Sequence, residues 1–252
     1  MASAFLAEIT RLLLHLAESQ EDRLQAAADA MATSLTAGGV VYFYGSGHSA
    51  IPALDVFPRY GTYVGLQPIH DPRLLWFNVL GPGGVRELLW LERQEGYVAN
   101  VLRSYPLGAS DTVVVYSHGG VNAAPVEAAL LSRDRGATVV GVTSLDGIES
   151  RAATHSSGKL LADVADICID TCAPAADALV AIEGLDRPVS ASSTVLTVAV
   201  TMELVARAAA GVVHRGGRLD VFASPVAAAD GRGNDFVFES YRTLQRRLQA
   251  VV

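Results

Sequence analysis

The sequence predicts a three-layer, doubly wound α/β fold with a five-stranded parallel sheet. Five short runs rich in β-branched residues occur at residues 40–44, 63–66, 112–116, 138–142 and 164–169. Most of these runs are apolar without alternation, which is typical of strands that are buried on both faces. Helical patterns over residues 86–104, 122–135 and 193–210 can supply the right-handed crossovers and the covering layers of such a sheet.

Helices are predicted ahead of the first strand, over residues 1–37. Phe5, Ile9, Leu12 and Leu16 recur at helical spacing, and the pattern resumes until two glycines at positions 38 and 39. A domain of this fold does not need that apolar stripe for its own core. We therefore expect the stripe to be exposed and to form the interface of a homodimer or higher homo-oligomer.

The composition indicates one domain with a full hydrophobic core. The chain has 252 residues, of which 50% are hydrophobic and 18% are charged, and it shows no internal repeat or linker. We divide this single domain, 1–252, into the N-terminal helices, a core over 38–210 and a tail over 211–252. The tail begins Gly-rich and irregular, and a final helix is predicted from about residue 238 to about residue 250.

The composition and the N-terminus disfavour several classes of function. A net charge of −7 argues against a nucleic-acid-binding surface. The apolar N-terminus contains Arg11 and His15, so it is neither a secretory signal nor a membrane span. Cys168 and Cys172 match neither a disulfide framework nor a zinc-ligand spacing. We therefore expect a cytoplasmic protein that needs no metal or cofactor and binds neither nucleic acid nor membranes.

Ligands of doubly wound sheets bind beyond the carboxyl ends of the strands, so the loops there are candidate sites. The first strand leads into Gly45-Ser46-Gly47-His48-Ser49, and a helical pattern follows that Pro58 ends. Glycines there let the backbone approach a ligand, and hydroxyls can bond to it. With Ala50 and Asp71 the loop also fits a dinucleotide fingerprint, but a lone match of this form has low specificity.

Two further polar segments precede predicted helices. The third strand ends in a loop from Ser117 to Asn122, whose free amides, hydroxyl and side-chain amide could bind an anion without any lysine. The alternative is a Gly-rich turn with a capping Asn. Residues 190–194 hold three serines and a threonine ahead of an apolar helix, and taken alone they are an ordinary N-cap.

Together, the three loops resemble the sugar isomerase (SIS) family, in which a G-x-G-x-S loop and a Ser-Thr helix start hold a sugar, and an S-x-S-G-x-T/N loop holds its phosphate. LERQEGY (91–97), HSSGK (155–159), AIEGL (181–185) and SSTV (192–195) look like a stand-alone bacterial subgroup, so the similarity covers nearly the whole chain. The sugar-binding residues that the resemblance implies are Gly45, Ser46, Gly47, His48, Ser49, Ser192, Ser193 and Thr194. The phosphate-binding residues that it implies are Ser117, His118, Gly119, Gly120 and Asn122, with Gly119 in place of the family's second serine.

Two glutamates are candidates for proton transfer. In an open-chain aldose phosphate, loss of the C2 proton gives an enediol, which isomerises by reprotonation at C1 or eliminates a C3 substituent. Glu92 and Glu95 lie three residues apart in the predicted helix, hence on one face, although a solvated pair with Arg93 is the alternative. LERQEGY is similar to the E-x-x-E segment of N-acetylmuramic acid 6-phosphate etherase, whose second glutamate acts in elimination, which implies Glu95 first and Glu92 second.

Further polar residues have more than one interpretation. Asp55 and Arg59 resemble the L-E-x-x-x-K stretch of the glucosamine-6-phosphate synthase isomerase domain, which implies sugar orientation, or they form a plain i,i+4 pair. Glu183 precedes the third loop and could act as a base, or as a cap or ion pair. The family resemblance implies that His155, beside Lys159, could reach a neighbouring subunit's site. The heptose-phosphate isomerase histidine has no counterpart among residues 195–210.

These observations predict an enzyme that acts on an amino-sugar 6-phosphate, for example N-acetylglucosamine 6-phosphate. Abstraction of the C2 proton followed by β-elimination, as in a lyase or dehydratase, is favoured over isomerisation. The alternatives are an aldose-ketose isomerase and a non-catalytic phosphosugar sensor. Regulators of that kind carry a DNA-binding helix-turn-helix, and about 38 residues before the first strand leave no room for one.

Overall fold

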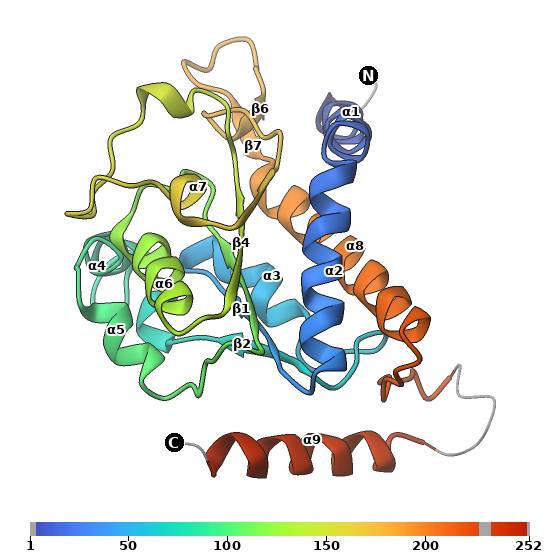
Figure 1. Cartoon of the computed structure of the whole chain (residues 1–252). Helices are drawn as coiled ribbons and strands as arrows, with labels where there is room; N and C mark the ends of the chain where they lie inside the picture. Colours follow the sequence, from blue (N-terminus) through green and yellow to red (C-terminus); the bar gives the residue numbers. More distant parts are fainter. Residues whose placement is uncertain (1–3, 227–232, 251–252) are drawn as a thin grey trace.

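A five-stranded parallel sheet lies at the centre of the molecule, with helices on both faces (Figure 1). The computed structural model describes residues 4–226 and 233–250. The strands run in the order β2-β1-β3-β4-β5, which confirms the predicted α/β fold class. Their bounds are β1 Val41–Tyr44, β2 Leu66–Ile69, β3 Thr112–Tyr116, β4 Thr138–Thr143 and β5 Ile167–Asp170.

Alternate side chains of each strand enter two separate cores, because successive residues of a strand point to opposite faces. Val41 and Phe43 pack in the core that is covered by α1 (Ala4–Ser19), α2 (Glu21–Thr36), α3 (Ala50–Asp55) and α8 (Ser193–His214). Tyr42 and Tyr44 pack in the core that is covered by α4 (Val85–Leu91), α5 (Tyr97–Leu102), α6 (Ala123–Asp134), α7 (Leu161–Val164) and α9 (Asp235–Gln249). The layering explains why the strand sequences are apolar without alternation.

The N-terminal apolar stripe is buried, so the expectation that it is exposed was wrong. Ile9, Leu12 and Leu16 are each 5% exposed, and Phe5 packs partly buried against the same core. Helix α1 contacts α8 and β6 (Ala178–Val180) of its own chain, and these elements provide the apolar surface that the stripe covers. The stripe therefore no longer supports a homodimer.

Two predicted elements have different bounds, and a glycine with positive φ lies at each change. Strand β2 begins at Leu66, where the predicted strand ended, and Gly65 with φ 112° precedes it. The predicted helix over 86–104 is instead two helices, α4 and α5, which are separated at Gly96 with φ 81°. Glu92 and Glu95 lie in the turn between them, so they do not share a helix face.

The connection from β5 to α8 contains an antiparallel hairpin that the sequence did not predict. Strands β6 and β7 (Val189–Ala191) pair through Ala178 with Ala191 and through Val180 with Val189. In Figure 1 this hairpin lies beyond the N-terminal end of α8, at the same end of the molecule as α1. Three short 3-10 helices, η1 Gly47–Ser49, η2 Pro72–Leu74 and η3 Ile148–Ser150, complete the described elements of the core.

The C-terminal tail is more helical than predicted. Helix α8 continues to His214, and α9 begins at Asp235 rather than near residue 238. Residues 227–232, in the segment predicted to be Gly-rich and irregular, lie outside the described residues. Within the described ranges, α8 alone is long and apolar enough to cross a bilayer, and its Leu196, Val200 and Leu204 are fully buried in the protein core.

Candidate functional site

A pocket of about 360 Å³ lies where the carboxyl ends of β1 and β3 meet the N-terminus of α8. The loop after β1 contributes Ser46, Gly47, His48 and Ser49. The loop after β3 contributes Ser117, His118, Gly119 and Asn122. Helix α8 contributes Ser193 and Thr194. All three segments that the sequence singled out therefore meet at one site.

Close backbone packing shapes the loop after β1. A Cβ atom on Gly45 would lie 2.0 Å from the carbonyl oxygen of Ser49, which leaves no room for any other residue. Gly47 has φ 56°, and a Cβ there would lie 3.3 Å from Leu88 and 3.4 Å from Trp76. The glycines thus allow the chain to turn sharply into η1 and to present Ser46 to the pocket.

Replacing Gly45 with alanine is expected to lower the free energy of unfolding by about 2 kcal/mol or more, because the backbone must move to admit a methyl group. Urea denaturation measures this change. Gly108→Ala is the matched control, since a Cβ there meets no atom within 4 Å. We expect that variant to change stability by less than about 0.5 kcal/mol. Equal effects at the two positions would contradict the tight turn at Gly45.

Hydrogen bonds fix the conformation of the loop after β3. The amide of Gly120, with φ 66°, donates to Ser117 Oγ at 3.1 Å. Arg151 donates through Nη1 to the Gly119 carbonyl oxygen at 2.9 Å. Two buried atoms, His118 Nδ1 and Asn122 Oδ1, have no hydrogen-bond partner among the described residues. Buried polar atoms normally have partners, so both are available to a ligand.

Glu92 joins the two loops inside the pocket. It is 8% exposed, and its carboxylate accepts hydrogen bonds from Ser46 Oγ at 2.9 Å and from Asn122 Nδ2 at 2.7 Å. Burial raises the pKa of Glu92 above its usual range, and these two hydrogen bonds and Arg93 only partly offset the effect. A buried carboxylate with a raised pKa in a pocket is suited to accept and release a proton.

The structure adds Asp177, which the sequence analysis missed. Asp177 lines the pocket and accepts hydrogen bonds from the amides of Ser192 at 2.9 Å and Ser193 at 2.7 Å. Burial alone would raise the pKa of Asp177, but the hydrogen bonds from Ser193, together with His118, hold it below its usual range. No local pattern marks this residue, because the hairpin that follows it brings it to the pocket.

Aromatic and apolar side chains form another wall of the pocket. Trp76 follows η2, and its ring lies 4.2 Å from the ring of His48, measured between centroids. Leu88 and Leu89 of α4 line the same wall. The sequence analysis missed all three residues as pocket residues, since their patterns predict only core packing. The pocket therefore combines an apolar wall with polar groups from the helix starts, as small-molecule sites do.

Comparison with known proteins agrees with this geometry. The SIS domain matches residues 4–144 of the chain, which is more than half of its length. The chain belongs to the SIS-domain family. This confirms the resemblance that the three loops indicated, and members of the family bind phosphosugars.

The relatives of this SIS domain are bacterial. A UPF0309 protein of Streptomyces coelicolor is 34% identical over 215 residues, which covers 85% of this chain and 84% of the relative. A UPF0309 protein of Halalkalibacterium halodurans is 31% identical over 96% of this chain and 95% of the relative. The solved structure of phosphoheptose isomerase from Neisseria gonorrhoeae matches 81% of this chain and 95% of its own with a TM-score of 0.55. At 18% identity, that structure shows the shared fold alone.

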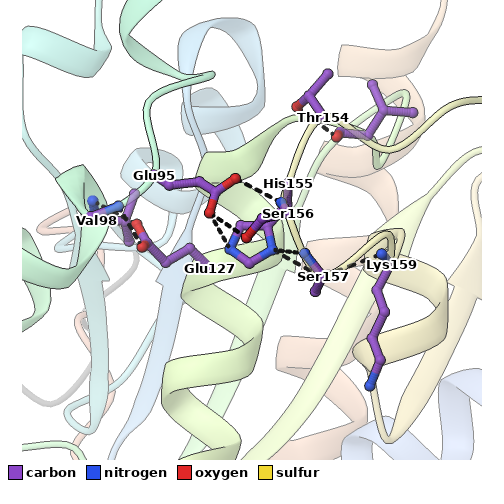
Figure 2. Close-up of polar contacts among 10 residues, drawn as sticks. Glu95, Val98, Glu127, Thr154, His155, Ser156, Ser157 and Lys159 are labelled. Atoms are coloured by element: carbon purple, nitrogen blue, oxygen red, sulfur yellow. Dashed lines mark hydrogen bonds and ion pairs between the residues drawn. The ribbon is translucent and has the colours of Figure 1, made fainter.

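Glu95 and His155 of the SIS domain are brought together, but away from the pocket lining (Figure 2). The Glu95 carboxylate accepts from Ser156 N and Ser156 Oγ, both at 2.6 Å, and lies 3.7 Å from His155 Nε2. The hydrogen bonds from Ser156 hold the pKa of Glu95 below its usual range. In Figure 2 the side chain points toward the 154–159 loop, which also contains Lys159. The hydrogen bonds therefore outweigh the effect of desolvation on the pKa of Glu95.

The other predicted site residues do not line the pocket. Arg59 Nη1 lies 2.5 Å from both carboxylate oxygens of Asp55, as an i,i+4 pair at the surface. Glu183 is exposed in the segment between β6 and β7. Asp71, the residue suggested for a ribose, instead pairs with Arg73 at 2.7 Å. Gly45, Gly120 and Ser192 belong to the three loop segments but do not line the pocket.

Metal binding has no candidate site in the described part of the chain. No group of three or more His, Cys, Asp or Glu side chains lies close enough to hold a metal ion among residues 4–226 and 233–250. Cys168 and Cys172 are free thiols, and burial raises the pKa of both.

Proposed function

We propose that this SIS domain is an enzyme that binds an amino-sugar 6-phosphate and transfers a proton at C2, with β-elimination favoured over isomerisation. The observation that carries the proposal is the buried Glu92, which lies in the pocket between two loop segments and has a raised pKa. A carboxylate that only binds ligand gains nothing from a raised pKa, whereas a general base works best when its pKa is closer to neutrality.

The loop after β3 is proposed to hold the phosphate. Its Ser117 hydroxyl and Asn122 side chain line the pocket just before the N-terminus of α6, where the helix dipole favours an anion. The Ser193 and Thr194 hydroxyls at the start of α8 line the same pocket and are proposed to bind the sugar. This division matches the roles that the sequence resemblance implies for the three segments.

Glu92 is proposed to take the C2 proton in place of Glu95. Ionised Glu92 accepts the proton, and the electrons of the C2–H bond form the C1–C2 double bond of an enolate, whose negative charge lies on the C1 oxygen. Elimination then breaks the bond from C3 to its oxygen, and the leaving oxygen needs a proton from an acid. His48 and His118 both line the pocket and are candidates for that acid. Return of the proton to C1 would instead complete an isomerisation.

The test is incubation of the protein with glucosamine 6-phosphate, N-acetylglucosamine 6-phosphate and glucose 6-phosphate in D₂O, followed by NMR. Exchange of the C2 proton together with an unsaturated product is expected. Exchange with a ketose product would favour the isomerase, and binding without any exchange would favour a sensor. If none of the three sugar phosphates binds, the proposed function is wrong.

We also propose a homodimer with the site near its interface. The support for this proposal comes from exposed apolar residues outside the α1 stripe. Phe77, Val79, Leu80 and Trp90 are between 63% and 74% exposed, and they lie in the chain segment that also supplies Trp76 to the pocket. Side chains of this kind are more often covered by a partner than left in water. A cytoplasmic location stays a prediction.

Sedimentation velocity at micromolar concentration is expected to give the mass of a dimer or larger assembly. Leu80→Glu should shift the protein toward monomer, because a charge in an apolar interface loses its hydration. Leu185→Glu is the control, since Leu185 is also exposed but lies between β6 and β7. A monomeric wild-type protein would contradict the prediction.

A further inference from the structure

The charges that line the pocket favour a ligand that carries a positive charge of its own. The lining side chains include the two carboxyl groups of Glu92 and Asp177 and the imidazoles of His48 and His118. Among residues 4–226 and 233–250, no Lys or Arg lines the pocket. A phosphate dianion must therefore be held by neutral donors and helix ends. A ligand that also carries an ammonium group would offset the carboxylates, and one with only hydroxyl groups would not.

The two oxygens of Asp177 are engaged unequally. Oδ1 accepts from Ser192 N at 2.9 Å, Ser193 N at 2.7 Å and Ser192 Oγ at 3.1 Å. Within the described part of the chain, Oδ2 accepts only from Ser193 Oγ, at 2.8 Å. A carboxylate offers about four acceptor positions, so Oδ2 keeps capacity for a further donor. The residue lines the pocket, which makes a ligand group the available donor.

The position of Asp177 is determined by the surrounding backbone. Its φ is 62°, a left-handed conformation that few residues other than glycine adopt, although Asp is among those that do. The next residue, Ala178, pairs with Ala191 in the β6–β7 hairpin, and Ser192 follows that pair directly. The hairpin and the start of α8 therefore fix the carboxylate before any ligand arrives, which lowers the entropy cost of binding.

We propose that Asp177 determines substrate specificity by binding the protonated, unacylated 2-amino group of the sugar phosphate. The proposal rests on the phosphosugar-binding function proposed above. An ammonium group donates to Oδ2 through a charge-assisted hydrogen bond, which is stronger than the bond from a hydroxyl at the same carbon. The phosphate then binds at the loop after β3, where His118 lies close enough to Asp177 to help lower the pKa of its carboxyl group.

Capping of α8 is the competing role for Asp177, because an Asp side chain that accepts from helix amides stabilises a helix start. Ser192, at the N-cap position, makes no capping hydrogen bond with its own side chain. A cap alone would affect all ligands equally. Recognition of an amino group would affect only ligands that carry one, and this difference separates the two roles.

The experiment is calorimetric titration at about pH 6.5 with glucosamine 6-phosphate and glucose 6-phosphate, which differ only in an ammonium or a hydroxyl group at C2. Wild-type protein should bind glucosamine 6-phosphate at least about tenfold more tightly. Asp177→Asn keeps the shape and should reduce the preference to less than about threefold, without weakening glucose 6-phosphate. Asp146→Asn is the control and should keep the wild-type preference. Asp146 Oδ2 accepts from the amide of Ala175 at 2.8 Å, two residues before Asp177, but Asp146 does not line the pocket.

Each result decides the proposal. Equal binding of the two sugar phosphates by wild-type protein overturns the role of Asp177 and leaves phosphosugar binding intact, and this holds even if Asp177→Asn fails to fold. Loss of both affinities by the same factor in Asp177→Asn assigns Asp177 to capping and overturns the proposal. Failure of wild-type protein to bind either compound overturns the proposal, and failure to bind N-acetylglucosamine 6-phosphate as well overturns the proposed function.

Discussion

Glu92→Gln is expected to lower turnover of the sugar phosphate by a factor of about 100 or more, while ligand affinity changes by less than about threefold. Glutamine keeps the size of the side chain and one acceptor oxygen but cannot accept a proton. The pocket can adapt to the change, because Asn122 Oδ1 has no partner and can turn to accept from the new amide. Steady-state kinetics and calorimetric titration measure the two quantities separately.

Glu95→Gln provides the matched control for this prediction. Glu95 is bonded to Ser156 outside the pocket lining, so its replacement should change turnover by less than about threefold. The two variants make the same chemical change three residues apart. If Glu95→Gln loses the activity and Glu92→Gln retains it, the base is the residue that the sequence resemblance implied, and our assignment of Glu92 is wrong.

The raised pKa of Glu92 also leads us to expect that the free energy of unfolding depends on pH. Because burial raises its pKa, the folded protein binds more protons than the unfolded chain between the ordinary glutamate pKa and the raised value. The contribution of Glu92 to stability is therefore complete below the ordinary pKa and is lost as pH rises through the raised one. Urea denaturation from about pH 4 to about pH 8 should show Glu92→Gln gaining stability relative to wild type as pH rises. A relative loss over that range would contradict the raised pKa.

The second large effect is expected at the proposed phosphate loop, where Asn122→Asp should weaken binding of glucosamine 6-phosphate by about 100-fold or more. The new carboxylate would face Glu92, which now lies 2.7 Å from Asn122 Nδ2, and it would repel a phosphate at the start of α6. Aspartate is a good N-cap, so the helix itself should still form.

Asn100→Asp is the control for charge, because it makes the same substitution at an exposed position of α5. It should leave affinity within about twofold of wild type. Glucosamine without phosphate should lose less than about threefold on Asn122→Asp, since most of the repulsion involves the phosphate. A similar loss for the sugar with and without phosphate would rule out this loop as the phosphate site.

Long-range contacts decided which candidate residues reach the pocket. Glu92 and Glu95 look equivalent in the chain, yet the left-handed Gly96 ends the turn between α4 and α5 and directs the two side chains to different places. Asp177 carries no sequence signal, because its place depends on a hairpin whose strands are only three residues each. The apolar stripe of α1 was expected to be exposed, but it is buried against α8 and β6, which lie far along the chain and which no local pattern pairs with α1.

The sequence by itself determined the fold class and the three loop segments that meet at the pocket. Apolar runs specify buried strands, and glycines and hydroxyls after them specify helix starts, because both signals act within a few residues. Only the tertiary structure decided which acid lies in the pocket, which one pairs with His155, and that Asp177 completes the site. Those outcomes depend on burial and on contacts between distant segments, and the pKa of a carboxyl group follows from such surroundings rather than from its neighbours in the chain.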